Sequence, residues 1–171
     1  RQVNFDNCKV PYNNMVGSEG DGFKIAMMGL DGGRINIASC SLGAAKFCID
    51  KSLKYVKERK QFGKYLSEFQ SIEFKIADMI TEYEAARLMV HKAAKAIDKN
   101  DTQVNYKCAM AKRFATDVCF KICNEALQIH GGYGYLTEYG IEKMVRDTRV
   151  HQILEGTNEI MKLIISRSYL Q

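Results

Sequence analysis

Residues 104–130 read VNYKCAMAKRFATDVCFKICNEALQIH. Apolar residues recur in this stretch at steps of three and four positions, which places them on one face of an α-helix. Those positions are Val104, Cys108, Ala111, Phe114, Val118, Ile122, Ala126 and Ile129. Gly131 and Gly132 follow directly, and glycine is common just after a helix end. The spacing therefore predicts one long amphipathic helix whose apolar face packs against other elements.

Two further segments carry the same apolar spacing. The first covers residues 23–58 and has Ile25 and Met28 in its apolar stripe. The second covers residues 66–97 and ends at a polar cluster. The only proline of the chain is Pro11, so nothing in these segments interrupts a helix. The sequence predicts three long helices.

Shorter periodic stretches follow the long ones. Residues 140–148 and 158–170 are predicted helices, separated by a loop over residues 151–157. Ser67 and Gln70 have the spacing of a capping box and are expected to start the second long helix. Three long and two short helices joined by short polar turns favour an all-α domain. We expect an antiparallel, up-down-up-down four-helix-bundle type with an extra short helix.

The beginning of the chain has a different pattern. Residues 3–11 alternate in the manner of a β-strand and then reach proline. A single strand has no partner in this chain. We interpret residues 1–18 as the end of a β-domain that lies upstream plus a linker, and residues 19–171 as the helical bundle domain.

Charge and composition exclude several classes of protein. The chain has 171 residues, 25 Lys and Arg against 20 Asp and Glu, and a formal net charge of +5. The basic residues are spread along the chain beside acidic ones, which indicates solvated helix surfaces and no nucleic-acid site. Apolar runs are far shorter than the roughly 18 residues of a spanning helix, so we expect no membrane insertion.

The six cysteines predict neither zinc nor disulfides. They occur at positions 8, 40, 48, 108, 119 and 123, without a Cys-x-x-Cys pair. Cys119 and Cys123 are one helical turn apart, which would allow a shared metal, but both fall in an apolar repeat. We expect them to be small buried core residues, expect no metal, and note that six thiols suit a reducing compartment.

Glu155 is the strongest candidate for chemistry. It lies between Leu154 and Gly156 in the loop before the last predicted helix. A carboxylate with apolar neighbours on a loop is desolvated, which strengthens it as a base. The alternative is a carboxylate that only interacts with the helix dipole, because Thr157 is a suitable N-cap.

Two other stretches are candidate anion sites. Residues 130–135 read HGGYGY, a glycine-rich turn that exposes backbone amides. It lacks a preceding strand and the Lys-Ser/Thr ending of a phosphate loop, so the pattern by itself favours a simple helix stop. Residues 59–64 read RKQFGK and end a predicted helix with three cations, which bind a pyrophosphate or complement the helix dipole. By pattern alone, His91, His130 and His151 are isolated packed or exposed residues.

Taken together, these motifs resemble the carboxyl-terminal domain of the acyl-coenzyme A dehydrogenases, over essentially the whole chain. Four motifs occur in the family's order: residues 3–23 (VNFDNCKVP with GSEGDGF), residues 59–63 (RKQFG), residues 128–134 (QIHGGYG) and residues 155–157 (EGT). Residues 29–43 and 145–155 further resemble the branch of the family that oxidises isobutyryl-coenzyme A. Asp31 departs from the Asn expected there in that branch.

The resemblance implies an FAD-dependent α,β-dehydrogenation of a short branched acyl thioester. Glu155 would remove the α-proton while the β-hydrogen leaves as hydride to the flavin, with the enolate oxygen stabilised by the Glu155 backbone N–H and a flavin hydroxyl. The implied cofactor-binding residues are Arg59 and Gln70 toward FAD from one subunit, and Gln128, Ile129, His130, Gly131 and Gly132 toward the FAD of its neighbour. Thr157, Asn158 and Glu159 would cover the flavin. The implied substrate-binding residues are Asp31, Gly32, Gly33, Arg34 and Arg167.

The resemblance also implies partners and a location. These are an acyl-CoA substrate, the electron-transferring flavoprotein, a homo-oligomer (dimer or tetramer) and the mitochondrial matrix, or the cytoplasm for a bacterial source. A 2-methylbutyryl- or butyryl-CoA dehydrogenase stays an alternative, as does a structural bundle that only drives self-association. Because the family's other two domains supply much of the pocket, we expect this chain by itself to bind FAD poorly and to turn over little.

Overall fold

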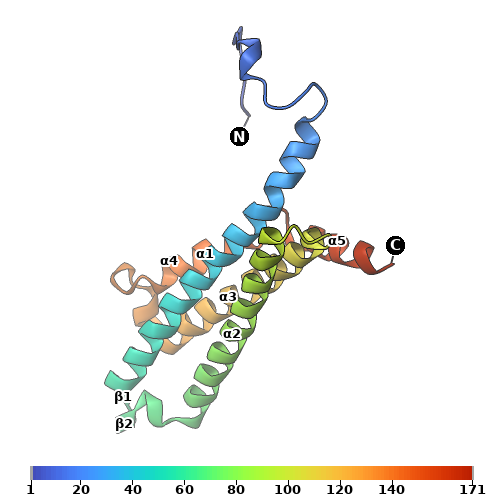
Figure 1. The fold of residues 1–171 in the computed structure, drawn as a ribbon. Coiled ribbons are helices and arrows are strands. Elements are labelled where there is room, and N and C mark those ends of the chain that lie inside the picture. The colour runs from blue at the N-terminus through green and yellow to red at the C-terminus, as the bar shows by residue number, and fades with distance from the viewer. Residues whose placement is uncertain (1, 171) are drawn as a thin grey trace.

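The computed structural model describes residues 2–170 and consists mostly of helices (Figure 1). Three long helices, α1 (Gly22–Glu58), α2 (Gln70–Asp98) and α3 (Val104–His130), lie side by side with alternating direction. Of two shorter helices, α4 (Ile141–His151) packs on α1 and α3, and α5 (Asn158–Leu170) packs on α3. The predicted all-α bundle with an extra short helix is confirmed.

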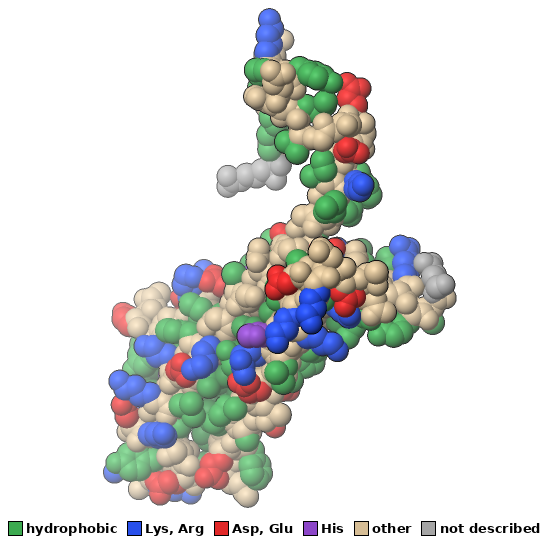
Figure 2. Space-filling model, viewed as in Figure 1, with side chains coloured by type: hydrophobic (Ala, Val, Ile, Leu, Met, Phe, Trp, Pro, Cys, Tyr) green, Lys and Arg blue, Asp and Glu red, His purple; other side chains and the backbone are tan. Residues whose placement is uncertain are grey.

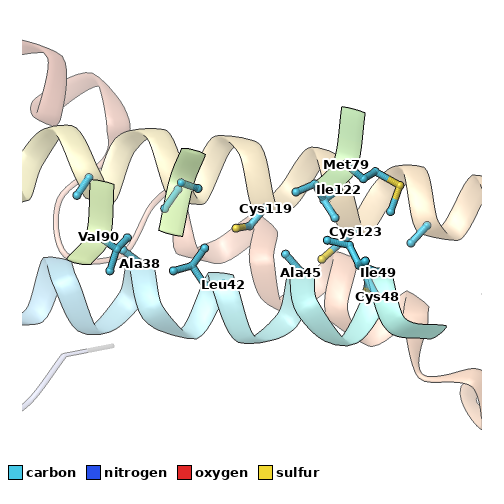
Figure 3. Packing of buried hydrophobic residues seen from close by; sticks show 14 of the residues in the cluster. Ala38, Leu42, Ala45, Cys48, Ile49, Met79, Val90, Cys119, Ile122 and Cys123 are labelled. Atoms are coloured by element: carbon cyan, nitrogen blue, oxygen red, sulfur yellow. The ribbon is translucent and has the colours of Figure 1, made fainter. Parts of the chain in front are cut away.

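The core lies between α1, α2 and α3 and is rich in small side chains (Figure 3). Ala38 and Ala45 of α1 are completely buried, as are Cys119 and Cys123 of α3. Small residues at these positions let the helix backbones approach closely, and Ile122 fills the space between them. The prediction that Cys119 and Cys123 are core residues is confirmed. Among the residues the structure describes, no group of three or more His, Cys, Asp and Glu is placed to hold a metal.

The N-terminal segment stands away from the bundle (Figures 1 and 2). The strand expected at residues 3–11 does not form; residues 2–21 contain a single 3-10 turn, Tyr12–Asn14. A strand requires a hydrogen-bonded neighbour, and the described chain offers none here. The first turns of α1 also extend past the other helices, so the predicted core positions Ile25 and Met28 are 40% and 68% exposed.

A small hairpin follows α1. Strands β1 (Lys60–Gln61) and β2 (Lys64–Tyr65) pair in antiparallel register. Between them, Phe62 and Gly63 have φ values of 51° and 83°, the pair of positive angles that a tight two-residue hairpin turn needs. The basic stretch after Glu58 is therefore a hairpin and not a continuation of the helix.

The start of α2 also differs from the prediction. A 3-10 turn, Leu66–Glu68, precedes it, and α2 begins at Gln70. The side chain that closes this turn is Glu68, whose carboxylate accepts a hydrogen bond from the Tyr65 N–H at 2.5 Å. The cap predicted at Ser67 is wrong, because the hairpin displaces the helix start.

Two 3-10 turns, Gly131–Tyr135 and Thr137–Tyr139, connect α3 to α4. The helix predicted at residues 140–148 continues to His151, which shortens the following loop to residues 152–157. Within residues 2–170, no helix is long and apolar enough to span a bilayer.

Candidate active site

Glu155 lies in the loop between α4 and α5, and its side chain is half-buried. Its backbone φ is 55°, and Gly156 follows with a φ of 88°. The left-handed region is unfavourable for a residue that carries a Cβ. The surrounding structure must therefore hold Glu155 in this conformation, and such strain is characteristic of functional sites.

The Glu155 side chain packs on Gly33 of α1. A Cβ at Gly33 would overlap a carboxylate oxygen of Glu155 and would lie 2.7 Å from its Cδ atom. The Glu155 carboxylate takes part in none of the ion pairs formed among residues 2–170. The contact thus places a carboxylate that forms no ion pair among residues 2–170 directly against a glycine of α1.

A buried ion pair lies one residue from this contact. Arg34 is 5% exposed, and its Nη1 atom donates to Oδ1 of Asp31 at 2.7 Å. Burial raises the pKa of Asp31, and the Arg34 guanidinium partly opposes that shift. The Nε atom of Arg34 has no hydrogen-bond partner in the described part of the chain. The predicted substrate-binding group at residues 31–34 is therefore brought beside Glu155, with a buried cation available to an acceptor.

The residues after Glu155 are fixed to α3 and α5. Thr157 Oγ1 accepts a hydrogen bond from the Ile160 N–H at 3.4 Å, as expected for an N-cap. Asn158 is 5% exposed, and its amide nitrogen donates to Asp117 Oδ1 at 2.7 Å. Glu159 is exposed at the start of α5, where backbone and Thr157 hydrogen bonds lower its pKa. Asn158 thus lies inside the protein, where its side chain attaches the loop to α3. Thr157 and Glu159 lie nearer the protein surface.

A second group of predicted residues lines a pocket of about 440 Å³ at the C-terminal end of α1. The Arg59 guanidinium lies 5.3 Å from the centre of the Tyr133 ring and faces the turn after α3. Gly131 and Gly132 line the same pocket, and a Cβ at either position would meet open space. The pocket combines a cation and exposed backbone with aromatic and aliphatic walls, which suits an anionic ligand with a flat ring.

His130 forms the floor of this pocket. It is 3% exposed, stacks on Tyr55 at 4.3 Å between ring centres, and its Nδ1 atom lies 2.8 Å from the Ala126 carbonyl oxygen. Because a carbonyl only accepts, Nδ1 carries the proton. Burial lowers the pKa of His130, which the Ala126 hydrogen bond partly offsets. The imidazole is therefore a buried ring of the pocket whose Nδ1–H is already bound to the Ala126 carbonyl.

The other predicted residues are more scattered. Gln70 and Gln128 are exposed and do not line this pocket, although Ile129 does. Arg167 is exposed on α5 and lines a groove of about 470 Å³ beside Tyr106. Gly33 and the last turn of α1 are separated by roughly 40 Å, at about 1.5 Å per residue. The chain therefore carries two sites, which do not meet.

The model of the acyl-CoA dehydrogenase C-terminal domain matches residues 20–170. This chain belongs to the acyl-CoA dehydrogenase family. It is 56% identical over 169 residues to the mitochondrial isobutyryl-CoA dehydrogenase of Bos taurus, covering 99% of this chain and 41% of that protein. It is 50% identical to the corresponding enzyme of Dictyostelium discoideum, covering 98% of this chain and 40% of that protein. Among solved structures, the butyryl-CoA dehydrogenase of Megasphaera elsdenii superimposes with a TM-score of 0.94 at 47% identity, covering 98% of this chain and 43% of that one.

The family resemblance drawn from the motifs is confirmed, and the chain spans about two fifths of the length of these relatives. The sequence patterns did not identify one functional candidate of this acyl-CoA dehydrogenase domain, Lys112. Lys112 of α3 is completely buried and donates to the loop that carries Glu155. The available signal was its place on the apolar face of α3, one helical turn after Cys108. A charge on an apolar stripe marks a buried polar contact.

Proposed function

We propose that this chain is the catalytic carboxyl-terminal part of a longer flavin-dependent acyl-CoA dehydrogenase, with Glu155 as the base. The observation that carries this proposal is the contact between Glu155 and Gly33. The loop holds the half-buried Glu155 carboxylate, which forms no ion pair among residues 2–170, against Gly33 and beside the buried Arg34. A purely structural bundle has no packing reason to keep Glu155 in the left-handed region.

In the proposed reaction, Glu155 removes the α-proton of the thioester and becomes a carboxylic acid. An α-proton of a thioester is weakly acidic, so the base must be close to it and poorly solvated, and the enolate oxygen needs a hydrogen-bond donor. The Glu155 backbone N–H supplies such a donor. FAD, when bound, accepts the hydride that leaves the β-carbon, and the product is the 2-enoyl thioester.

The residues of the Arg59 pocket fit one part of FAD. The guanidinium suits the pyrophosphate, and the open turn at Gly131 and Gly132 allows a phosphate to approach the backbone. Arg59, His130 and both glycines line a single pocket, so we assign them to one FAD and not to two. Because that pocket lies roughly 40 Å along α1 from Gly33, its FAD serves the Glu155 site of another subunit. The proposal therefore includes a homo-oligomer.

We propose isobutyryl-CoA as the substrate, supported by the two isobutyryl-CoA dehydrogenases among the relatives. Dehydrogenation of 2-methylbutyryl- or butyryl-CoA is the alternative, and the similarity to a butyryl-CoA dehydrogenase structure keeps it in view. The electron-transferring flavoprotein is the proposed electron acceptor. The mitochondrial matrix is the proposed location, with the cytoplasm for a bacterial source.

The test uses the protein that carries this chain together with its upstream domains. Purified protein is mixed anaerobically with isobutyryl-, 2-methylbutyryl- or butyryl-CoA while the flavin absorbance is followed. We expect bleaching with isobutyryl-CoA, and none in Glu155→Gln, whose amide is not a base. Glu138→Gln, an exposed change between α3 and α4, is the matched control and bleaches normally.

Three results would contradict the proposal. Equal bleaching in Glu155→Gln places the base elsewhere. Faster bleaching with another thioester would show that this thioester, and not isobutyryl-CoA, is the preferred substrate. A protein without flavin that only self-associates supports the structural bundle. Separately, FAD titrated into the isolated chain should bind poorly; micromolar binding with turnover would overturn that expectation.

A further inference from the structure

Lys112 is a buried charge for which the proposed chemistry has no direct use. It projects from α3, has no exposed surface, and is the largest of the fully buried side chains. Removing an ammonium group from water is costly unless its donors are satisfied. A methionine of similar length would fill the same space without that cost. The contacts of the ammonium group must therefore account for the presence of lysine.

All three protons of the ammonium group have acceptors in one short segment. The Nζ atom donates to the Gly156 carbonyl at 2.8 Å, to the Gln152 carbonyl at 3.2 Å and to Asn158 Oδ1 at 2.8 Å. These acceptors are neutral and lie on both sides of Glu155 in the chain. Lys112 thus binds the loop at three points: at Gln152 where it begins, at Gly156 directly after Glu155, and at Asn158 where it ends.

Other groups around Lys112 strengthen this attachment. The Gln152 carbonyl also accepts from the Asn158 N–H at 3.1 Å, which closes the loop on itself. Asp117, five residues further along α3, accepts from the side chains of Gln152 at 2.8 Å and of Asn158 at 2.7 Å. The two ends of the loop are therefore both fixed to side chains of α3.

Lys112 keeps its proton at neutral pH. Burial lowers its pKa to about 8, with the Arg34 charge acting in the same direction and Asp117, Glu159 and Glu155 opposing it. The ammonium form, which is the form with three donors, is thus the major one at pH 7.

We propose that Lys112 is the positioning residue that holds the loop from Gln152 to Asn158, and through it keeps the Glu155 carboxylate against Gly33. Lys112 does not touch the reacting atoms in this arrangement. Its ammonium group fixes the carbonyls beside the strained Glu155 backbone, which would otherwise relax from the left-handed region. The inference rests on the proposed role of Glu155.

The test compares Lys112→Met with Lys121→Met in the flavin-loaded, full-length protein. The first variant keeps the apolar volume and loses every donor. The second removes an exposed lysine of the same helix, whose partner is Glu82. In Lys112→Met we expect amide hydrogen exchange over residues 152–158 to accelerate by more than about ten-fold, while the α1–α3 core stays protected. We also expect kcat to fall on the order of 100-fold with little change in KM.

A third variant separates positioning from packing. Lys112→Gln retains donors on a shorter side chain, so it should keep more loop protection and more activity than Lys112→Met. A packing role predicts the opposite order, because methionine fills the apolar space better. That order would overturn the proposal, as would wild-type exchange and kcat in Lys112→Met. If Lys112→Met does not fold, Lys112→Gln decides: wild-type exchange over residues 152–158 and unchanged kcat would overturn the proposal.

Failure of the proposed function gives a different result. If Glu155→Gln bleaches flavin normally, Glu155 is not the base whatever Lys112 does. The exchange measurement in the Lys112 variants still reports whether the ammonium group holds the loop. Each conclusion therefore has its own readout.

Discussion

The carboxylate of Glu155 occupies the space that a side chain at Gly33 would take. One residue lies on a strained loop and the other in the middle of a long helix, so neither determines the contact by its local sequence. The helix provides a flat surface there only because residue 33 lacks a Cβ. A requirement for glycine inside a helix, where it is unfavourable, is explained by this contact.

Gly33→Ala should therefore impair the reaction without unfolding the protein. The added Cβ would push the carboxylate away from its present position, and we expect the rate of flavin reduction to fall on the order of 100-fold. Gly43→Ala, also on α1 but facing open space, is the control. Rapid-mixing absorbance measures the rate. A normal rate in Gly33→Ala would show that the contact does not constrain Glu155.

Arg59→Ala should weaken FAD retention. The guanidinium is the cation of the pocket at the end of α1, and loss of one charged hydrogen bond to the ligand corresponds to about a ten-fold rise in the dissociation constant. The control is Lys60→Ala, because the Lys60 ammonium lies over the Tyr65 ring at 4.3 Å. The ratio of flavin to protein absorbance after gel filtration measures the loss. An equal loss in both variants would argue against a specific role of Arg59.

Ile122→Ala should destabilise the bundle. The Ile122 side chain is completely buried between the long helices, so its removal leaves a cavity and costs about 2–5 kcal/mol of unfolding free energy. Leu88→Ala, at a position 63% exposed on α2, should cost less than about 1 kcal/mol. Urea denaturation followed by circular dichroism distinguishes them. Similar losses at the two sites would mean that the packing around Ile122 is loose.

Stability should fall as the solution becomes acidic below about pH 6.5. Burial lowers the pKa of both His130 and His151, so the unfolded chain binds protons at a pH where the folded one does not. Each histidine then lowers the free energy of unfolding by up to about 1.4 kcal/mol for each pH unit of acidification. This loss occurs between the pKa of the histidine in the unfolded chain and its lower pKa in the folded protein.

Urea unfolding between pH 5 and 8 measures this dependence. The double variant His130→Asn, His151→Asn should lose less stability than the wild type on acidification, since asparagine does not titrate. His91→Asn, at an exposed position of α2, is the matched control. A double variant with an unchanged pH profile would show that other groups cause the acid instability.

Much of the fold could be predicted from the sequence because helix formation leaves a local periodic pattern. The third long helix was predicted to end before Gly131 and does so, and α5 spans the predicted residues 158–170. The errors occur where tertiary or turn geometry decides. Phe62 and Gly63 form a hairpin turn that moves the start of α2, and the stripe through Ile25 and Met28 continues where no other helix covers it.

The candidate sites likewise combine features that local sequence determines with features that tertiary packing determines. The identity of Glu155, its place on a loop, the Thr157 cap and the family motifs are properties of short stretches, and the sequence alone determined them. Only the tertiary structure decided that Glu155 faces Gly33, that Arg59 shares a pocket with Gly131, and that Lys112 holds the loop. Residues this far apart in the chain lie together because the long helices pack in one fixed register relative to one another. A periodic pattern shows which face of a helix is buried, but not which residue of another element lies opposite.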